Sequence, residues 1–333
     1  MRSKIVLCTC LLWLCTAEIQ AQSCCATGSG CNYSILPDLD KNLVGLRWTY
    51  SQYDNRNFSL NPELNGIKNN ERLNTLEVFG RFKLPKRFDL SVFVPVTFIR
   101  QYSSLSDTHE RGLGDVSLLA QYQILNPTKF GCKKVKHQLK VGLGTKLPTG
   151  RYKKNSADLY NTSVQLGSGS VDVLMNVNYS LTYRKLVMMA RTAYKLNTVN
   201  SSSFRFGDKV ENGIRFSYAI NAGKLTLMPS AGVTYTHLFD NYDHHQPVYE
   251  SHADLLAATA GLEAYVGHFA FNISAAPALY QQVNVLAYKQ RFIMEVGTFY
   301  ISNYKKLFGN ERKCFYSPTL WRQVLPSPSC TDS

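Results

Sequence analysis

The feature that most constrains this chain is a period of two in its hydrophobic residues. The pattern starts at Leu43: Val44, Leu46 and Trp48 fall on one side, while Arg47 falls on the other. It recurs in twelve segments, and no Asp, Glu, Lys or Arg occupies an apolar position of any segment. Such alternation is typical of β-strands with two unlike faces. The apolar positions run through residues 44–50, 76–84, 90–98, 116–124, 139–147, 173–183, 186–196, 210–220, 225–235, 256–266, 269–279 and 292–300.

Two kinds of β-protein alternate in this way. A soluble β-sandwich buries its apolar face as a core, whereas a membrane barrel turns that face to lipid and lines its lumen with the polar face. The segments are about ten residues long, which is the length that a tilted strand needs to cross the hydrocarbon. Aromatic residues also stand at several segment ends, as in the interfacial girdles of barrels: Tyr50, Phe98, Tyr122, Tyr183, Tyr194, Phe292 and Tyr300.

The connections between the segments alternate in length, as the loops and turns of outer-membrane barrels do. The long ones are 55–74, 101–112, 148–170, 198–207, 239–254 and 281–288, and the short ones are 85–87, 184, 221–223 and 267–268. Only residues 126–136 depart mildly from this rule. We therefore predict an all-β protein, a transmembrane antiparallel up-and-down β-barrel of about 12 strands over residues 43–302.

The N-terminus predicts an export signal. Arg2 and Lys4 precede an apolar run at 5–17, and Ile19-Gln20-Ala21 offers a cleavage site, so residues 1–21 are interpreted as a signal peptide. Cleavage before Cys24, as in a lipoprotein, is the less favoured alternative. Residues 22–42 then form a Cys-bearing periplasmic lead and residues 303–333 a basic C-terminal tail. The expected location is the outer membrane of a Gram-negative cell.

The chain is basic, with a formal net charge of +14 that becomes +13 once Arg2, Lys4 and Glu18 are removed. A basic chain can bind nucleic acid, but the basic residues form no cluster on a helix face and no zinc-finger or helix-turn-helix pattern occurs. We expect outer-membrane lipids, with their phosphate groups, as the partner; the charge serving solubility alone is an equal alternative. The oligomeric state is open.

Three short Gly-rich fragments carry a family resemblance. Residues 112–116, Gly-Leu-Gly-Asp-Val, open the fourth segment, residues 144–150 close the fifth, and residues 166–170 precede the sixth, with Asp172 following. In this order they resemble the outer-membrane β-barrel family of the phenol-degradation-pathway (MetA-pathway) transporter type, over roughly residues 24 to 302. The resemblance implies a barrel and a transport role, but neither a substrate nor catalytic residues. From the residues alone, the glycines are expected to serve bends and close backbone approaches.

Six cysteines remain after cleavage, and the predicted topology puts all of them on the periplasmic side, where disulfides persist. Disulfides that tether the two termini to a turn are the leading hypothesis, although 15 pairings are possible. A Cu(I) site on Cys24, Cys25 and Cys31 is the alternative, and these three look like the Cys-rich segment of some family members. The six cysteines are Cys24, Cys25, Cys31, Cys132, Cys314 and Cys330.

One predicted outer loop is rich in imidazole and carboxylate groups, which together can bind a transition metal. A solvated polar loop is the simpler interpretation, and no cofactor is expected. The candidate ligands are His237, His244, His245 and His252, beside Asp240, Asp243 and Asp254.

Two kinds of barrel enzyme can be tested against the sequence. A barrel phospholipase needs a His and a Ser two residues apart, because the nucleophile must lie within reach of its base, and none of the seven histidines is followed by x-Ser. An omptin-type protease needs an Asp-Asp pair, and the chain has none. We therefore do not expect an enzyme.

The polar positions of the segments are expected to line the lumen. Their signs nearly balance, which favours internal salt-bridge networks over a ring of one sign, and Phe79, Phe93 and Phe299 also point inward, so an apolar solute could be tolerated. The predicted function is a passive channel or transporter of small solutes; the alternative is a structural or adhesive outer-membrane protein with a plugged lumen, possibly metal-binding. The lumen-facing candidates are Arg47, Glu77, Arg81, Arg191, Glu211, Arg215, Glu263 and Glu295.

Overall fold

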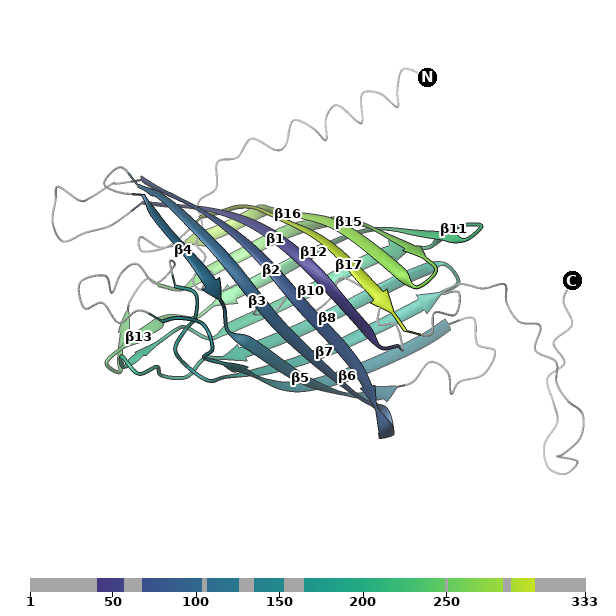
Figure 1. The fold of residues 1–333 in the computed structure, drawn as a ribbon, viewed down its shortest axis with the longest axis horizontal. Coiled ribbons are helices and arrows are strands. Elements are labelled where there is room, and N and C mark those ends of the chain that lie inside the picture. The colour runs from purple at the N-terminus through teal and green to yellow at the C-terminus, as the bar shows by residue number, and fades with distance from the viewer. Residues whose placement is uncertain are drawn as a thin grey trace, which may run out of the picture.

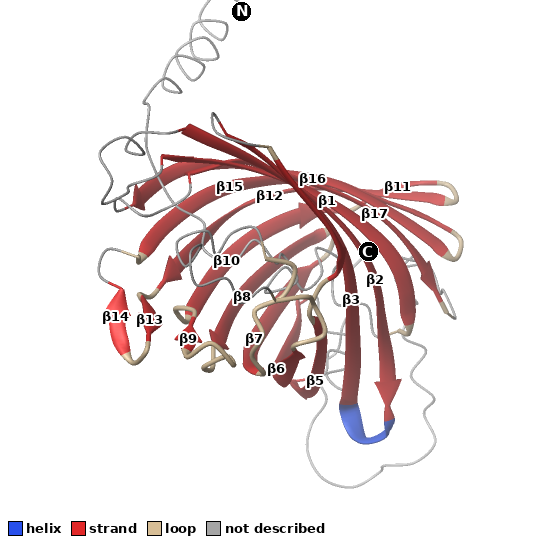
Figure 2. Ribbon diagram, turned by 60° about the vertical axis from the view of Figure 1, so that its left-hand side comes forward, coloured by secondary structure: helices blue, strands red, loops and turns tan. Residues whose placement is uncertain are grey.

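The computed structural model describes residues 41–56, 68–103, 107–125, 135–152, 165–248, 251–283 and 289–302. Within these ranges no helix is long and apolar enough to cross a membrane. The predicted signal peptide (1–21), nearly all of the Cys-bearing lead, the tail (303–333) and all six candidate cysteines lie outside the described residues. Figure 2 shows that β-strands make up most of the described chain.

The described strands form one antiparallel barrel and one small sheet. The barrel contains β1 (Leu43–Arg56), β2 (Lys68–Leu84), β3 (Phe88–Ser103), β4 (Thr108–Leu113), β5 (Val116–Leu125), β6 (Val135–Leu147), β7 (Asp172–Tyr183), β8 (Leu186–Leu196), β10 (Lys209–Tyr218), β11 (Ile220–Ala222), β12 (Leu225–Leu238), β15 (Ala253–Val266), β16 (Phe269–Val283) and β17 (Lys289–Ile301). The small sheet contains β9 (Phe204–Arg205), β13 (Asn241–Asp243) and β14 (Gln246–Val248).

The barrel closes between its first and last strands. β1 pairs with β17 from Leu43 opposite Ile301 to Asp54 opposite Lys289, and on its other side it pairs with β2 (Figure 1). Two wall positions are each shared by two strands: β4 and β5 both pair with β3, and β10 and β11 both pair with β12. The wall therefore has 12 positions, and the predicted 12-stranded barrel is confirmed. Closure gives each of the 12 wall positions a neighbour on both sides, which a membrane requires of a β-structure.

The outer face is apolar and the inner face is polar, the reverse of a soluble fold. On β2, Val78 is 46% exposed, while its neighbours Glu77 and Phe79 are 3% and 5% exposed. Aromatic rings pack together on the outside near the short turns: Phe88 and Tyr122 have ring centroids 5.0 Å apart. An exposed apolar surface that runs over every strand is far larger than soluble proteins carry. The apolar outer surface of this barrel is therefore suited to lipid rather than to water.

The strands are longer than the apolar pattern predicted. Parts of the predicted long connections 55–74 and 101–112 are strand, since β2 already starts at Lys68, β3 ends only at Ser103 and β4 starts at Thr108. The pattern ended too early because the outward positions turn polar there, at Arg72 and Arg100. Backbone pairing does not depend on apolar side chains, so the ladder continues beyond the apolar band.

The two ends of the barrel differ in their connections. At one end, two-residue turns join β7 to β8, β11 to β12 and β15 to β16, and each turns through a residue of positive φ: Arg184 (53°), Gly223 (60°) and Gly267 (57°). Positive φ at such tight turns follows the twist of the flanking strands. The opposite end holds the longer connections and the small sheet (Figures 1 and 2). We call these the short-turn end and the loop end.

Candidate functional site

The barrel lumen is the candidate functional site. All eight lumen candidates occupy inward positions of their strands, and most are nearly inaccessible: Arg47 is 6% exposed, Glu263 2% and Glu295 4%. Alternation places them there, because each follows an outward apolar residue by one position. Ionised side chains in such an enclosed space require partners. The described part of the lumen has three zones along the barrel: a charged layer, an apolar layer and a buried ionic network.

The middle zone is a charged layer built from opposite sides of the wall. On β1, Arg47 bonds Glu77 of β2 and lies 3.8 Å from Glu295 of β17, measured from Nη1 to Oε2. Asn272 donates a hydrogen bond of 3.1 Å to the same Glu295. These contacts cross the seam where the barrel closes, so they bind the first and last strands through side chains as well as backbone.

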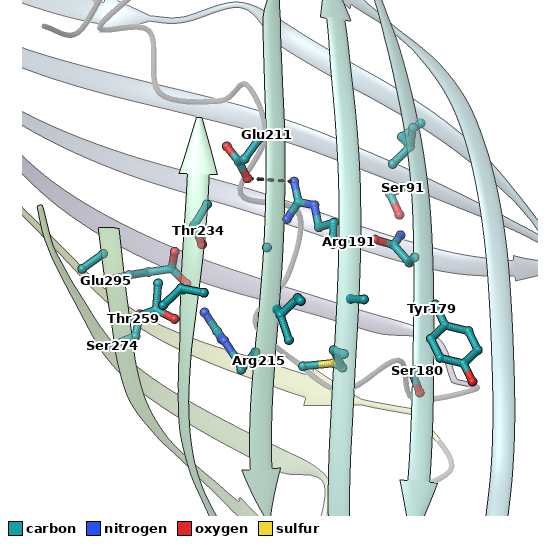
Figure 3. A pocket seen from close by; sticks show the side chains of 18 of the residues that line it. Ser91, Tyr179, Ser180, Arg191, Glu211, Arg215, Thr234, Thr259, Ser274 and Glu295 are labelled. Atoms are coloured by element: carbon teal, nitrogen blue, oxygen red, sulfur yellow. Dashed lines mark ion pairs between the residues drawn. The ribbon is translucent and has the colours of Figure 1, made fainter. Parts of the chain in front are cut away.

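A second ionic group of this layer surrounds Glu211 of β10. The guanidinium of Arg191 lies 3.6 Å from Oε1 of Glu211, and Nζ of Lys209 lies 3.2 Å from Oε2. Arg215 extends from the same strand toward Glu295, as Figure 3 shows. Farther along the wall, Tyr265 donates a hydrogen bond of 2.5 Å to Glu263.

Next to the charged layer, toward the short-turn end of β1 and β2, apolar side chains fill the lumen. Phe79 stacks on Phe93 at 6.1 Å between ring centroids and meets Phe299 edge-on at 5.1 Å. Gly45 leaves room for these rings, since a Cβ there would lie 2.5 Å from the Phe299 ring. We call this cluster the apolar layer: Leu43, Phe79, Phe93, Leu119, Val187, Ala219, Met228, Tyr265, Ala270, Phe299 and Ile301, with Met189 packed against it.

The apolar layer joins nearly opposite walls. Phe79 stands on β2 and Val187 on β8, five positions apart around the 12-position wall, yet both belong to one packed cluster. Phe79 is 5% and Val187 3% exposed. The apolar layer therefore reaches across the lumen at this level. A cavity of about 170 Å³ lies between the apolar layer and the charged layer.

At the loop end, a buried ionic network centres on Lys146. Its Nζ lies 2.8 Å from Oδ2 of Asp115 and 2.6 Å from Oδ2 of Asp172, and Lys195 lies 3.5 Å from the same oxygen of Asp172. The side chains of these four residues are at most 4% exposed. Two cations and two anions thus neutralise one another away from water, which is the condition for keeping such charges buried.

The Lys146 network also holds a segment of the chain inside the barrel. Asp115 accepts hydrogen bonds from the backbone nitrogens of Ser168 (2.9 Å) and Gly150 (3.0 Å), and Ser170 donates one of 2.8 Å to Asp172. We call residues 165–170 the inward segment. Its Leu166 is 3% exposed and packs into a cluster with Tyr53, Leu73 and Ile99, from inward positions of β1, β2 and β3. The inward segment therefore narrows the lumen at the loop end.

The Gly-rich motifs meet at this point. A Cβ on Gly150 would lie 2.7 Å from the carbonyl oxygen of Leu166, and one on Gly167 would lie 2.6 Å from both Asp115 and Gly150. Only glycine permits so close an approach of two backbones. The structural role expected for these glycines is thus observed, and the three fragments that carried the family resemblance form a single site.

The structure does not bring the four candidate histidines together. His237, His244 and His252 each contact a different carboxylate, namely Asp254 at 2.8 Å, Asp243 at 2.8 Å and Asp240 at 3.1 Å. His245 stands in the turn between β13 and β14 with a φ of 65°. Among the described residues, no group of three or more His, Cys, Asp or Glu side chains is arranged to hold a metal ion.

Sequence reasoning treated the Lys146 network only as part of a balanced set of lumen charges. A sharper signal was present, because Asp115, Lys146 and Asp172 each lie inside or next to one of the Gly-rich fragments. The extent of the apolar layer was also missed. Of its members, only Phe79, Phe93 and Phe299 were expected inside, since an alternating pattern assigns apolar side chains to the lipid face by default.

Comparison with known proteins places this geometry in context. Residues 71–262, more than half of the chain, match the family model described as "Putative MetA-pathway of phenol degradation". No curated protein matches. Among solved structures, an outer membrane channel from Pseudomonas putida F1 is similar at 16% identity with a TM-score of 0.58, covering 81% of this chain and 98% of that one. The β-domain of the Bordetella autotransporter BrkA is similar at 13% identity with a TM-score of 0.45, covering 79% and 100%.

Proposed function

The chain belongs to the phenol-degradation (MetA-pathway) family, as its Gly-rich fragments predicted, and on that premise we propose that it is a passive outer-membrane channel for small solutes. The observation that carries this proposal is the lumen itself. Its inner wall holds ionised and polar side chains from every side, while the outer wall is apolar, so a polar solute meets matching groups only inside. Such a channel would not be an enzyme.

The proposal includes an orientation. Residues 1–21 are removed on export, and the short turns lie on the periplasmic side while the loop end faces outward, as in other barrels of this kind. Phosphate groups of outer-membrane lipids would then meet the basic rim of the barrel, which carries Arg72 and Arg100 at outward positions.

Two constrictions limit the size of the solute. The inward segment narrows the loop end, and the apolar layer closes on the cavity from the other side. Apolar constrictions can gate a pore by excluding water. We therefore expect a small conductance rather than the large one of an open porin.

Planar-bilayer recording tests the channel function. Purified full-length protein should give discrete single-channel current steps. When water enters the apolar layer, hydrated ions can pass along the charged lumen. The control is the same preparation after heat unfolding. A barrel that is correctly folded, as judged by its heat-modifiable migration on gels, yet electrically silent would instead favour the structural or adhesive alternative.

The apolar layer gives a second test. Phe79→Ala removes the ring that touches both Phe93 and Phe299, so the single-channel conductance should rise at least about twofold as the constriction widens. Phe82→Ala is the matched control, since Phe82 lies on the same strand but faces outward at 42% exposure. Equal conductance in the two variants would show that the apolar layer does not limit the current.

A further inference from the structure

The cavity between the two layers has walls of opposite character. On one side it is lined by members of the apolar layer, Phe79, Phe93 and Leu119 among them, together with Met189. On the other side it is lined by Arg191, Arg215, Glu211 and Glu295 (Figure 3), and Arg81 of β2, two residues beyond Phe79, also belongs to the lining. A pocket that combines an apolar wall with a few convergent polar groups is the usual form of a small-molecule site.

The charge balance at the cavity favours an anion. Glu211 is already engaged by Arg191 and by Lys209, and Glu295 by Arg47 and by Asn272. Both carboxylates that border the cavity thus draw partly on cations that stand outside its lining. The lining itself holds three cations, Arg81, Arg191 and Arg215, against two anions, Glu211 and Glu295.

Two arginines of the lining have space beside them. Arg191 pairs across the sheet with Gly213, and Arg215 pairs with Gly232, so on one of its two sides the inward position next to each arginine carries no side chain. A Cβ at Gly232 would collide with the backbone of Ile214. Nη1 of Arg215 is buried and has no hydrogen-bond partner among the described residues. Arg215 therefore retains a donor that the described part of the protein does not use.

The volume sets the size of the ligand. The cavity of about 170 Å³ is close to the roughly 150 Å³ of an engineered apolar cavity that holds a benzene ring. About six carbon atoms can therefore lie against the apolar layer. A carboxylate at one end of such a body would reach the guanidinium side, where planar, bidentate pairing is available.

We propose that this cavity binds small monocarboxylates with an apolar body of about six carbon atoms, the carboxylate toward Arg191 and Arg215 and the body on the apolar layer. The inference rests on the proposed channel function, because it makes the cavity a stopping point on the path of the solute. It narrows that function from small solutes in general to amphipathic organic anions.

Equilibrium binding to the purified full-length protein in detergent tests the site, with empty micelles as the blank. Cyclohexanecarboxylate should bind by calorimetry at least about tenfold more tightly than cyclohexylamine, which has the same body and the opposite charge, and than acetate, which lacks the body. Arg215→Gln should weaken the binding of cyclohexanecarboxylate by at least about tenfold. Arg100→Gln, at an outward position of β3, should leave it within about twofold.

Different outcomes separate this inference from the channel function. Equal binding of the three probes, or no effect of Arg215→Gln in a protein with wild-type gel migration, overturns the anion site. Conductance steps without any cyclohexanecarboxylate binding overturn the site and leave the channel supported. Binding by a barrel that stays silent in bilayers supports the site and overturns the channel function.

Discussion

Lys146→Met is expected to lower the free energy of unfolding by about 3–5 kcal/mol, because it leaves Asp115 and Asp172 as buried carboxylates that have lost their shared cation. Methionine has nearly the length of lysine, so the loss comes from charge rather than from a cavity. The inward segment should loosen as well, since Ser168 and Ser170 depend on these carboxylates. Urea titration of the folded barrel in lipid vesicles measures the first effect, and increased noise in single-channel current measures the second.

The control for Lys146→Met is Lys224→Met, in the exposed turn between β11 and β12. That variant should unfold like the wild type. The triple variant Asp115→Asn, Lys146→Met, Asp172→Asn removes the whole set of opposed charges and should recover part of the lost stability, since neutral side chains need no counter-ion. If Lys146→Met and Lys224→Met unfold at the same urea concentration, the network does not stabilise the barrel.

The facing of almost every strand could be predicted, and the physical reason is simple. A residue such as Val78 must tolerate hydrocarbon, whereas Glu77 must not touch it. A strand that crosses a membrane therefore has a period of two in its hydrophobic residues. The even strand number and the unequal connections then follow from closure and from the sidedness of the membrane. None of these features depends on which residue of one strand lies opposite which residue of the next.

Register could not be predicted for the same reason. A shift of two residues keeps every side chain on its own face, so the alternating pattern does not distinguish one pairing from another. Arg47 could therefore be expected inside, but not opposite Glu77 and near Glu295. These partners lie far away in the sequence, and only the closed barrel selects them.

The inward segment shows a different limit. Residues 148–170 were predicted as a long outer connection, and residues 165–170 instead lie inside the barrel, where Leu166 packs against Tyr53 and Ile99. A polar, Gly-rich stretch gives no period of two or 3.6, so its path depends on long-range contacts. Asp115 and Asp172 supply these contacts. The Gly-rich fragments meet at this point, but their sequences alone do not show that they are in contact.

Val177→Arg should cost about 2–4 kcal/mol of stability in a bilayer, the range expected for an arginine on the lipid face near the membrane midplane. Val177 is 43% exposed on the outer surface and lies in the middle of β7, opposite Val141 and Thr192. The long side chain of the new arginine would have to reach an interface or draw water into the hydrocarbon. Guanidinium unfolding of vesicle-embedded protein measures the cost.

Ser180→Arg is the matched control, since it adds the same side chain to the same strand at an inward position that lines the cavity (Figure 3). There the guanidinium meets water and polar neighbours, so the change in stability should be much smaller. The difference between the two variants therefore measures which face of β7 meets lipid, independently of strand propensity. Equal costs for Val177→Arg and Ser180→Arg, or a wild-type chain that is monomeric in water without detergent, would contradict a barrel whose apolar surface is turned outward.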